Sequence, residues 1–421
     1  MIDNFTTPDN KDKFAILAAA RIVPTVFLYA LVLTFLLTFS STSFDGLQNI
    51  NESASEGSLG NKVFWFLLLC FTLFVWGKIP KHEISNLNKH VYLLIAYISY
   101  AVLSAIWSDV PLISLRRSVQ QVIIAFCILS PFIMGIDRKQ ILHKVTCVLT
   151  LFVFINVALI PLFGIADFGY RGICPQKNIL GQISVIAFFF CTYGVINSSG
   201  KTRMMFLASS LLSIFLCIIS NSKTSLGLLL IVPLASYLMI FLASIKAPLK
   251  QAFFVIVCIL IIYIVFTASI LVPFDIYDIS EAIFHDRTFT GRTVIWEFAG
   301  NNIDGSPYIG YGYGSFWGVG STTKAIGQGF IGGLLQAHNG FIDIVLELGY
   351  FGLVVANLFI FALLKSMLNV TKSDMWLALL LVSCLLFILL NNVMESSLFR
   401  GYVPLWVTLL FCSGFTCRDK L

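Results

Sequence analysis

A histidine and an asparagine, His338 and Asn339, stand where a polar stretch gives way to a long apolar run. An imidazole changes its charge near neutral pH, so it can accept a proton from a hydroxyl group if its site keeps it uncharged at rest. An isolated histidine is more often a satisfied polar residue or a helix cap at an interface. The neighbouring residues favour the alternative, in which His338 is a general base at the mouth of a cavity.

Basic residues in the polar segments between apolar runs are candidates for binding an anion. A single interfacial cation is more often a contact to lipid phosphates. Several cations on one face instead indicate a phosphate or diphosphate ligand, which the fork of an arginine fits and to which each bond contributes roughly 1.5–3 kcal/mol. The candidate anion-binding residues are Arg116, Arg117, Arg171, Lys177, Asn178, Arg287 and Arg292.

Positions 310–318 are rich in glycine and aromatic residues and lie in a polar segment that also contains Trp296. Glycines let a backbone approach a ligand closely, and the face of Tyr311 is suited to a sugar ring. Glu395 either pairs with an arginine of the site or is a solvated loop acid. Asp343 and Glu347 share one face of a predicted helix, and the sequence assigns no role to either.

The elements that must position these residues are membrane helices. A chain of 421 residues that is 58% hydrophobic and 11% charged cannot bury its apolar surface in one water-soluble core. Apolar runs of about 20 residues match the hydrocarbon thickness of a bilayer. We therefore predict an all-α polytopic membrane protein with about twelve transmembrane helices. The predicted spans are 21–40, 62–79, 91–107, 116–135, 145–163, 179–197, 203–220, 225–243, 250–272, 341–364, 375–391 and 400–416.

The distribution of lysine and arginine predicts the orientation of the chain. Most of the 27 basic residues fall on the side that holds both termini, which is therefore expected to be cytoplasmic. The chain divides into an N-terminal bundle of nine helices (1–272), a large periplasmic loop (273–337) and three C-terminal helices (338–421). The loop is rich in aromatic residues, which favours an ordered cap over disorder. A helix is expected to begin at Gly291 or Arg292.

Several functional classes are not favoured by the composition. The net charge of +6 is spread over the loops, with no run of basic and aromatic residues that would indicate a nucleic-acid partner. Cys174 alone among the ten cysteines is predicted in an outer loop, so no disulfide framework is expected. Histidines and cysteines form no pattern typical of a metal site, and we predict no cofactor.

These motifs together resemble the bacterial O-antigen ligase and polysaccharide polymerase superfamily. The resemblance covers roughly residues 105–400, and its most specific part is His338–Asn339 followed by the Gly-x-x-Gly of residues 349–352. Arg171, Arg292 and the large outer loop support it. The segment from Trp107 to Arg117 is similar to exopolysaccharide polymerases.

The resemblance implies a metal-independent glycosyltransferase of the membrane-embedded C type, acting at the periplasmic face of the bacterial inner membrane. Its donor would be a glycan linked to undecaprenyl diphosphate, and its acceptor either another lipid-linked repeat or lipid A core. By position, Arg171 and Arg292 would bind the diphosphate and His338 would be the base. Polymerase and ligase share the donor and the chemistry, so both remain open. A transporter of lipid-linked oligosaccharides is the alternative of another class, but charged groups here crowd one face and spare the spans.

Overall fold

The computed structural model describes residues 10–33, 59–78, 87–164, 168–244, 291–320 and 334–418, and within these ranges all regular structure is helical. The α-helices are α1 (Asn10–Leu28), α4 (Leu59–Lys78), α5 (Lys89–Leu103), α6 (Pro111–Ile133), α7 (Arg138–Ala158), α8 (Ile160–Phe163), α9 (Lys177–Asn197), α10 (Gly200–Ile219), α11 (Lys223–Ser244), α14 (Arg292–Ile303), α16 (Gly340–Asn369), α17 (Met375–Asn391) and α18 (Pro404–Phe415). Shorter turns are η1 (Tyr29–Leu33), η3 (Ser104–Ile106) and η4 (Val370–Lys372).

Nine helices among the described residues are long and apolar enough to cross a membrane. They coincide with nine of the predicted spans, so the prediction of an all-α polytopic membrane protein is confirmed. The predicted span at 250–272 lies outside the described residues, and the count of twelve stays a prediction. The helix expected at the start of the 291–298 segment is present as α14. Nine cysteines in the described part of the chain are free thiols.

The last helix, α18, differs from the full span predicted at 400–416. It has 12 residues and is about 18 Å long, which is shorter than the roughly 30 Å of a bilayer core. Every residue from Leu405 to Phe415 is buried. A helix that is apolar on all sides is stable in this way when other helices surround it. Residues 400–403 belong to the predicted span but lie outside this helix, so they can form part of a polar site.

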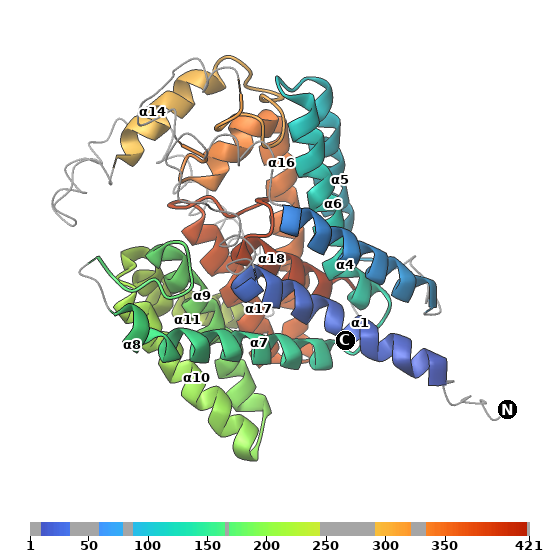
Figure 1. Cartoon of the computed structure of the whole chain (residues 1–421), viewed down its shortest axis with the longest axis vertical. Helices are drawn as coiled ribbons and strands as arrows, with labels where there is room; N and C mark the ends of the chain where they lie inside the picture. The colour runs from blue at the N-terminus through green and yellow to red at the C-terminus, as the bar shows by residue number, and fades with distance from the viewer. Residues whose placement is uncertain are drawn as a thin grey trace.

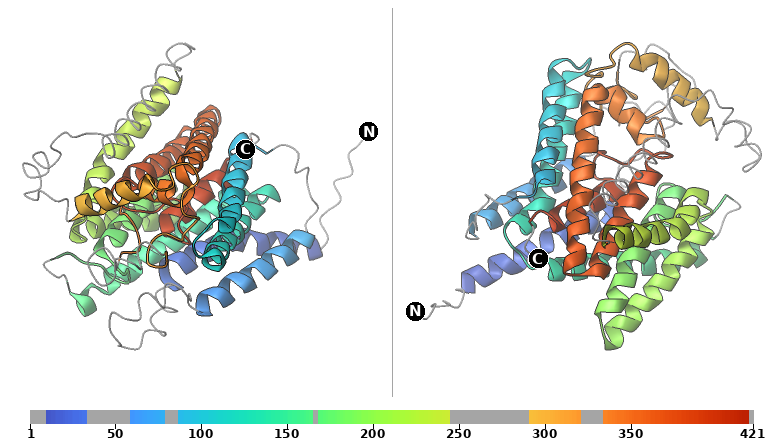
Figure 2. Two further views of the ribbon diagram at one scale, coloured as in Figure 1. Left: turned by 90° about the horizontal axis from the view of Figure 1, so that it is seen from above. Right: turned by 180° about the vertical axis from the view of Figure 1, so that it is seen from behind.

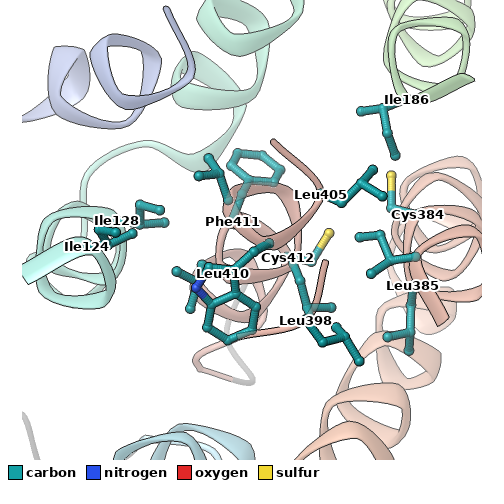
Figure 3. Packing of buried hydrophobic residues seen from close by; sticks show 14 of the residues in the cluster. Ile124, Ile128, Ile186, Cys384, Leu385, Leu398, Leu405, Leu410, Phe411 and Cys412 are labelled. Carbon is teal, nitrogen blue, oxygen red and sulfur yellow. The ribbon is translucent and has the colours of Figure 1, made fainter. Parts of the chain in front are cut away.

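The surroundings of α18 form the centre of the hydrophobic core (Figure 3). Ile124 and Ile128 of α6 approach one side of the helix, and Cys384 and Leu385 of α17 approach another. Helices outside this core expose their apolar side chains, as Leu230 of α11 does with 73% of its surface accessible. Such exposure of apolar side chains is expected of helices that face lipid.

Three long helices lie side by side in Figure 1, where α5 is in contact with both α6 and α16. The helix α14 and the start of α16 are at the top of that view, and the hairpin of α9 and α10 extends to the bottom. The view from behind in Figure 2 keeps the same separation between the orange and light green ends. The residues around His338 thus gather at one end of the molecule.

The helix α16 is interrupted at Gly349, whose φ of 66° and ψ of −173° are not helical. The backbone groups released by this break pair with an irregular segment at 307–312. Tyr350 N–H donates to Pro307 O at 2.8 Å, and Gly312 N–H donates to Glu347 O at 2.8 Å. Irregular backbone at membrane depth needs such internal partners. The break therefore joins the start of α16 to the segment before it in one rigid unit.

Replacing Gly349 by alanine is expected to destabilise this unit. A Cβ at this position would lie 2.1 Å from the carbonyl carbon of Tyr308, and a positive φ adds about 1–3 kcal/mol of backbone strain. Gly227→Ala in α11 is the matched control, because a Cβ there meets nothing within 4 Å and φ is not positive. Thermal unfolding of the purified full chain in detergent should show a lower Tm for Gly349→Ala only; equal Tm values would contradict this account of the break.

Candidate functional site

His338 lies two residues before α16 in a left-handed backbone conformation, with φ of 54°. The next residue, Asn339, caps the helix: its Oδ1 accepts hydrogen bonds from the N–H groups of Phe341 at 3.0 Å and Ile342 at 3.2 Å. Asn339 is fully buried. Asn339 thus fixes the backbone that presents His338, and the direct substrate contact predicted from the sequence stays a prediction.

The loop after α17 returns to the same place and brings Glu395 to His338. Gly340 N–H donates to Asn392 O at 2.8 Å, and a Cβ on Gly340 would lie 2.2 Å from Asn392 Oδ1. The Asn392 Oδ1 also accepts from the N–H groups of Ser397 and Leu398. These bonds stabilise the loop, so the position of Glu395 relative to α16 is determined by backbone contacts.

Glu395 is the centre of the site. Its Oε2 lies 3.1 Å from His338 Nδ1, and its Oε1 lies 3.0 Å from Arg292 Nη2. Asn178 at the start of α9 donates its Nδ2 to the same Oε1 at 3.1 Å. One carboxylate therefore connects α9, α14 and the start of α16, and it pairs with an arginine, as one of the two interpretations of the sequence held.

The contact with Glu395 sets the protonation of the imidazole. A carboxylate only accepts hydrogen bonds, so Nδ1 carries the proton and donates it to Oε2, although the amide of Gln336 also lies 3.3 Å from Nδ1. The imidazole Nε2 has no hydrogen bond to any described residue, and 26% of the side chain is exposed. In the neutral ring, Nε2 then holds the lone pair that a general base needs.

Glu395 remains ionised because its partners outweigh its burial. Burial opposes the charge, but the hydrogen bond from His338 and the charge of Arg292 lower the pKa of the carboxyl below its usual value. A carboxylate at this distance also stabilises the imidazolium that forms when Nε2 accepts a proton. The pair can therefore act as an acid–base unit.

A second cluster of charges lies along the first two turns of α16. The Arg400 Nη2 is 2.7 Å from Asp343 Oδ2 and 3.2 Å from Glu347 Oε1, and both carboxylates are buried. Asp343 also accepts hydrogen bonds from Trp317 Nε1 at 2.6 Å and from the N–H of Ala337 at 3.1 Å. This cluster connects the loop before α18 to the segment that leads to His338.

Arg117 belongs to the second cluster and not to the group around Glu395. Its Nη1 donates a hydrogen bond to Gly314 O, and its charge interacts with those of Glu347 and Arg400. Its neighbour Arg116 is half-buried on the first turns of α6. The predicted anion-binding residues are thus divided between two places.

The remaining candidates are not in contact with the Glu395 group among the described residues. Arg171 is exposed in the loop before α9. Lys177 donates its Nζ to Phe168 O at 2.6 Å. Arg287 lies outside the described residues. The expected roles of these three residues stay predictions.

The segment at 310–318 packs against other parts of the protein, and the sugar contact expected of Tyr311 stays a prediction. Tyr311 donates its hydroxyl to Asn302 O at 2.8 Å, and its N–H donates to Leu346 O at 2.9 Å. A Cβ on Gly310 would lie 2.5 Å from the backbone of Glu347. The glycine at this position is needed because the segment packs against the residues just before the break in α16.

Arg400 is the site residue that sequence reasoning missed. Two acidic residues four positions apart, Asp343 and Glu347, share one face of an apolar helix, and buried carboxylates at such a position need a cation. That requirement was the available signal. The sequence did not identify which cation meets this requirement. Arg400 is at least 53 positions further along the chain than either acid, and it stands at the start of a segment that was predicted as a full span.

Comparison with known proteins finds two similarities. Residues 208–356 match the family model described as O-antigen ligase, a range that includes α14, His338 and the break in α16. The chain is also 25% identical, over 363 residues, to the exopolysaccharide production protein ExoQ of Rhizobium meliloti (strain 1021). That alignment covers 80% of this chain and 78% of the relative.

Both findings support the O-antigen ligase and polysaccharide polymerase superfamily. The resemblance read from the sequence motifs is thereby confirmed. At a coarse level, the family implies a glycosyltransferase-like membrane enzyme with lipid-linked polysaccharide substrates. The match does not distinguish ligation from polymerisation, and it assigns no residue.

Proposed function

We propose that this protein transfers a glycan from undecaprenyl diphosphate to the hydroxyl group of another lipid-linked repeat unit, with His338 as the general base. The observation that carries the proposal is that Glu395 binds His338 and Arg292 at once. One carboxylate thus holds a base for the acceptor hydroxyl beside a cation for the donor's phosphates. O-antigen ligation onto lipid A core is the second candidate, favoured by the description of the matching family.

In the proposed reaction, Nε2 of His338 removes the proton of the acceptor hydroxyl while its oxygen attacks the anomeric carbon of the donor. The bond from that carbon to the diphosphate breaks, and undecaprenyl diphosphate leaves with the electron pair. The imidazolium is stabilised by Glu395 during this step. The diphosphate is a good leaving group, so the costly contributions are proton removal and the alignment of two bulky lipid-linked substrates.

Arg292 is proposed to bind the departing diphosphate together with Arg171. A guanidinium has five N–H donors, and the bond from Nη2 to Glu395 uses only part of them. Arg292 is partly exposed, with 17% of its side chain accessible. The arginines would neutralise the charge on the leaving group without a metal ion, which makes metal independence part of this proposal.

Arg292→Ala and Arg171→Ala are each expected to lower glycan transfer while expression stays normal. A lost charge-assisted bond of roughly 1.5–3 kcal/mol corresponds to about a 10- to 150-fold effect. Lysine should restore little activity, because a point charge does not reproduce the guanidinium fork. Arg203→Ala is the control, since Arg203 is exposed on the first turn of α10, a helix that contributes no residue to the group around Glu395. Full activity in both alanine variants would exclude the diphosphate contact.

We further propose that the chain lies in the inner membrane with both termini in the cytoplasm and His338 at the periplasmic face. The distribution of basic residues supports this orientation, because positive charge is retained on the cytoplasmic side. The same proposal includes a large periplasmic loop at 273–337. This loop separates the N-terminal helices (1–272) from the C-terminal helices (338–421).

Product analysis separates polymerase from ligase. The purified full chain in detergent is supplied with undecaprenyl-diphosphate-linked repeat units, with and without lipid A core as acceptor. A polymerase makes longer lipid-linked glycans without lipid A core, whereas a ligase makes product only when lipid A core is present. If neither product forms and the donor only moves across the membrane of reconstituted vesicles, the transporter alternative replaces the enzyme.

A further inference from the structure

A polar cavity of about 420 Å³ lies at the end of α16 away from His338. The helix α16 begins beside His338 and ends at Asn369, which lines this cavity. Three cations from three separate parts of the chain also line it, namely Arg138, Lys372 and Arg418. The cavity is within the size range of small-molecule sites, and it is not part of the site described above.

The charged residues that line this cavity in the described part of the chain are all basic. None of the described lining residues is acidic. The nearest acids in the sequence serve as helix caps: Asp137 accepts from Lys139 N–H at 2.9 Å, and Asp374 accepts from Leu377 N–H at 2.9 Å. Cations that line one cavity repel each other, and an anion between them removes that repulsion. The cavity therefore favours an anionic ligand.

Backbone carbonyls hold the walls of the cavity in place. Arg138 donates its Nη1 to Arg418 O at 3.4 Å, and Arg418 donates its Nη2 to Ile133 O at 2.9 Å. Asn88 donates its Nδ2 to Thr416 O at 2.8 Å. One carbonyl uses only part of the donor capacity of the Arg138 guanidinium, and arginine is the side chain best suited to two oxygens of one phosphate. A preorganised wall of this kind lowers the cost of binding.

Exposed aromatic residues place the cavity at the level of lipid headgroups. Trp376 follows Lys372 by four positions and is 46% exposed, and Tyr92 follows Asn88 by four positions and is 52% exposed. Tryptophan and tyrosine are enriched at this level of membrane proteins because one part of each ring system is apolar and another polar. A ligand with a phosphate group and apolar chains can meet both surroundings here.

We propose that this cavity binds the phosphate group of an anionic phospholipid, with Arg138 and Lys372 as its principal contacts. In the proposed orientation it is the cytoplasmic end of the protein, where clustered basic residues attract anionic lipids. Such a lipid would connect the ends of α5, α7, α16 and α18 at a point remote from the reaction. This site is additional to the proposed glycan transfer and does not depend on it.

Binding can be measured on the purified, delipidated full chain in neutral detergent. The probes are short-chain phosphatidylglycerol, phosphatidylcholine with the same chains, and inorganic phosphate, each titrated while Tm and heat of binding are recorded. Phosphatidylglycerol should bind and raise Tm, and the other two probes should have little effect. Lys372→Gln and Arg138→Gln should each weaken binding roughly tenfold or more, since each removes a charge-assisted bond. Lys365→Gln and Lys139→Gln are matched controls, because both lysines are exposed on the same helix ends and outside the cavity lining.

The outcomes separate the sources of the phosphate group. Equal binding of inorganic phosphate, lost in the two cavity variants only, supports the anion site with a soluble ligand as its source. Equal binding of phosphatidylcholine, or an equal loss in the control variants, overturns the proposal, as does the absence of binding of every probe to the native chain. Lys372 is exposed and has no hydrogen bond among the described residues, so its variant remains informative if Arg138→Gln does not fold.

Discussion

Glu395→Gln is expected to lower glycan transfer by about 10²–10⁴-fold, the usual contribution of acid–base catalysis. An amide cannot stabilise the imidazolium of His338, and it leaves Arg292 without a counter-charge. The glutamine amide can also donate its N–H group to Nδ1 of His338. The ring proton then lies on Nε2, which no longer has a lone pair to accept the proton of the acceptor hydroxyl. The measurement is the rate of polymer formation by the purified variant.

Glu297→Gln is the control for this variant, because Glu297 is an exposed acid on the same helix as Arg292.

A second measurement on Glu395→Gln is the stability of the folded protein as a function of pH. The pKa of Glu395 is lowered in the folded chain, so its stabilising effect is present above the unfolded pKa and is lost as the pH falls through the lowered folded value. That part of the acid sensitivity should disappear in Glu395→Gln. Unchanged transfer in the variant would mean that Glu395 does not support the base.

Arg400→Met is expected to destabilise the protein more than any other single change discussed. It leaves the buried carboxylates of Asp343 and Glu347 without their cation, and breaking a buried ion pair in this way typically costs about 3–5 kcal/mol. Tm in detergent is the measurement, with Arg203→Met as the control on an exposed surface.

The double variant Arg400→Met/Glu347→Gln tests the reason for this loss. Asp343 keeps its hydrogen bonds from Trp317 and Ala337, so removing the charge of Glu347 should recover part of the lost Tm. Additive losses in the double variant would show that the packing of Arg400, and not its charge, stabilises this region.

The sequence was sufficient to predict the class of fold, because the length and apolarity of a membrane helix are local properties. It predicted too long a helix at α18, which has 12 residues and is preceded by an irregular segment that contains Arg400. Hydropathy does not distinguish a lipid-facing residue from one buried among other helices. Burial of Leu405 to Phe415 depends not only on the preceding α17 but also on α1, α6 and α9, which are distant in the sequence.

The sequence predicted the residues of the candidate site better than it predicted the contacts between them. His338, Arg292, Asn178 and Glu395 were all expected to contribute, and the structure brings these four together. The grouping depends on the loop after α17, which returns to the start of α16 through Asn392 and Gly340. A contact of this kind joins positions more than 50 residues apart and leaves no periodic signal in the sequence.

For the glycines between 310 and 314, the sequence predicted the kind of contact but not the partner in that contact. Their types indicate a close approach of backbone, and this inference was sound, but the sequence does not identify what approaches. The structure shows that Gly310 meets the backbone of Glu347 and Gly312 meets Ser108. The Gly-x-x-Gly pattern at 349–352 has a similar origin at its first position, where the break in α16 requires a residue without a side chain.

The central claim is that Nε2 of His338 removes the acceptor proton, and parallel assays of His338→Ala and His285→Ala test it most directly. Each purified variant is assayed for polymer formation from lipid-linked repeat units and, separately, for binding of the donor lipid. We expect His338→Ala to lose transfer while it still binds the donor, because Arg292 and Arg171 are intact, and we expect His285→Ala to retain both. Substantial turnover by His338→Ala, or a loss of donor binding as complete as the loss of turnover, would contradict the claim.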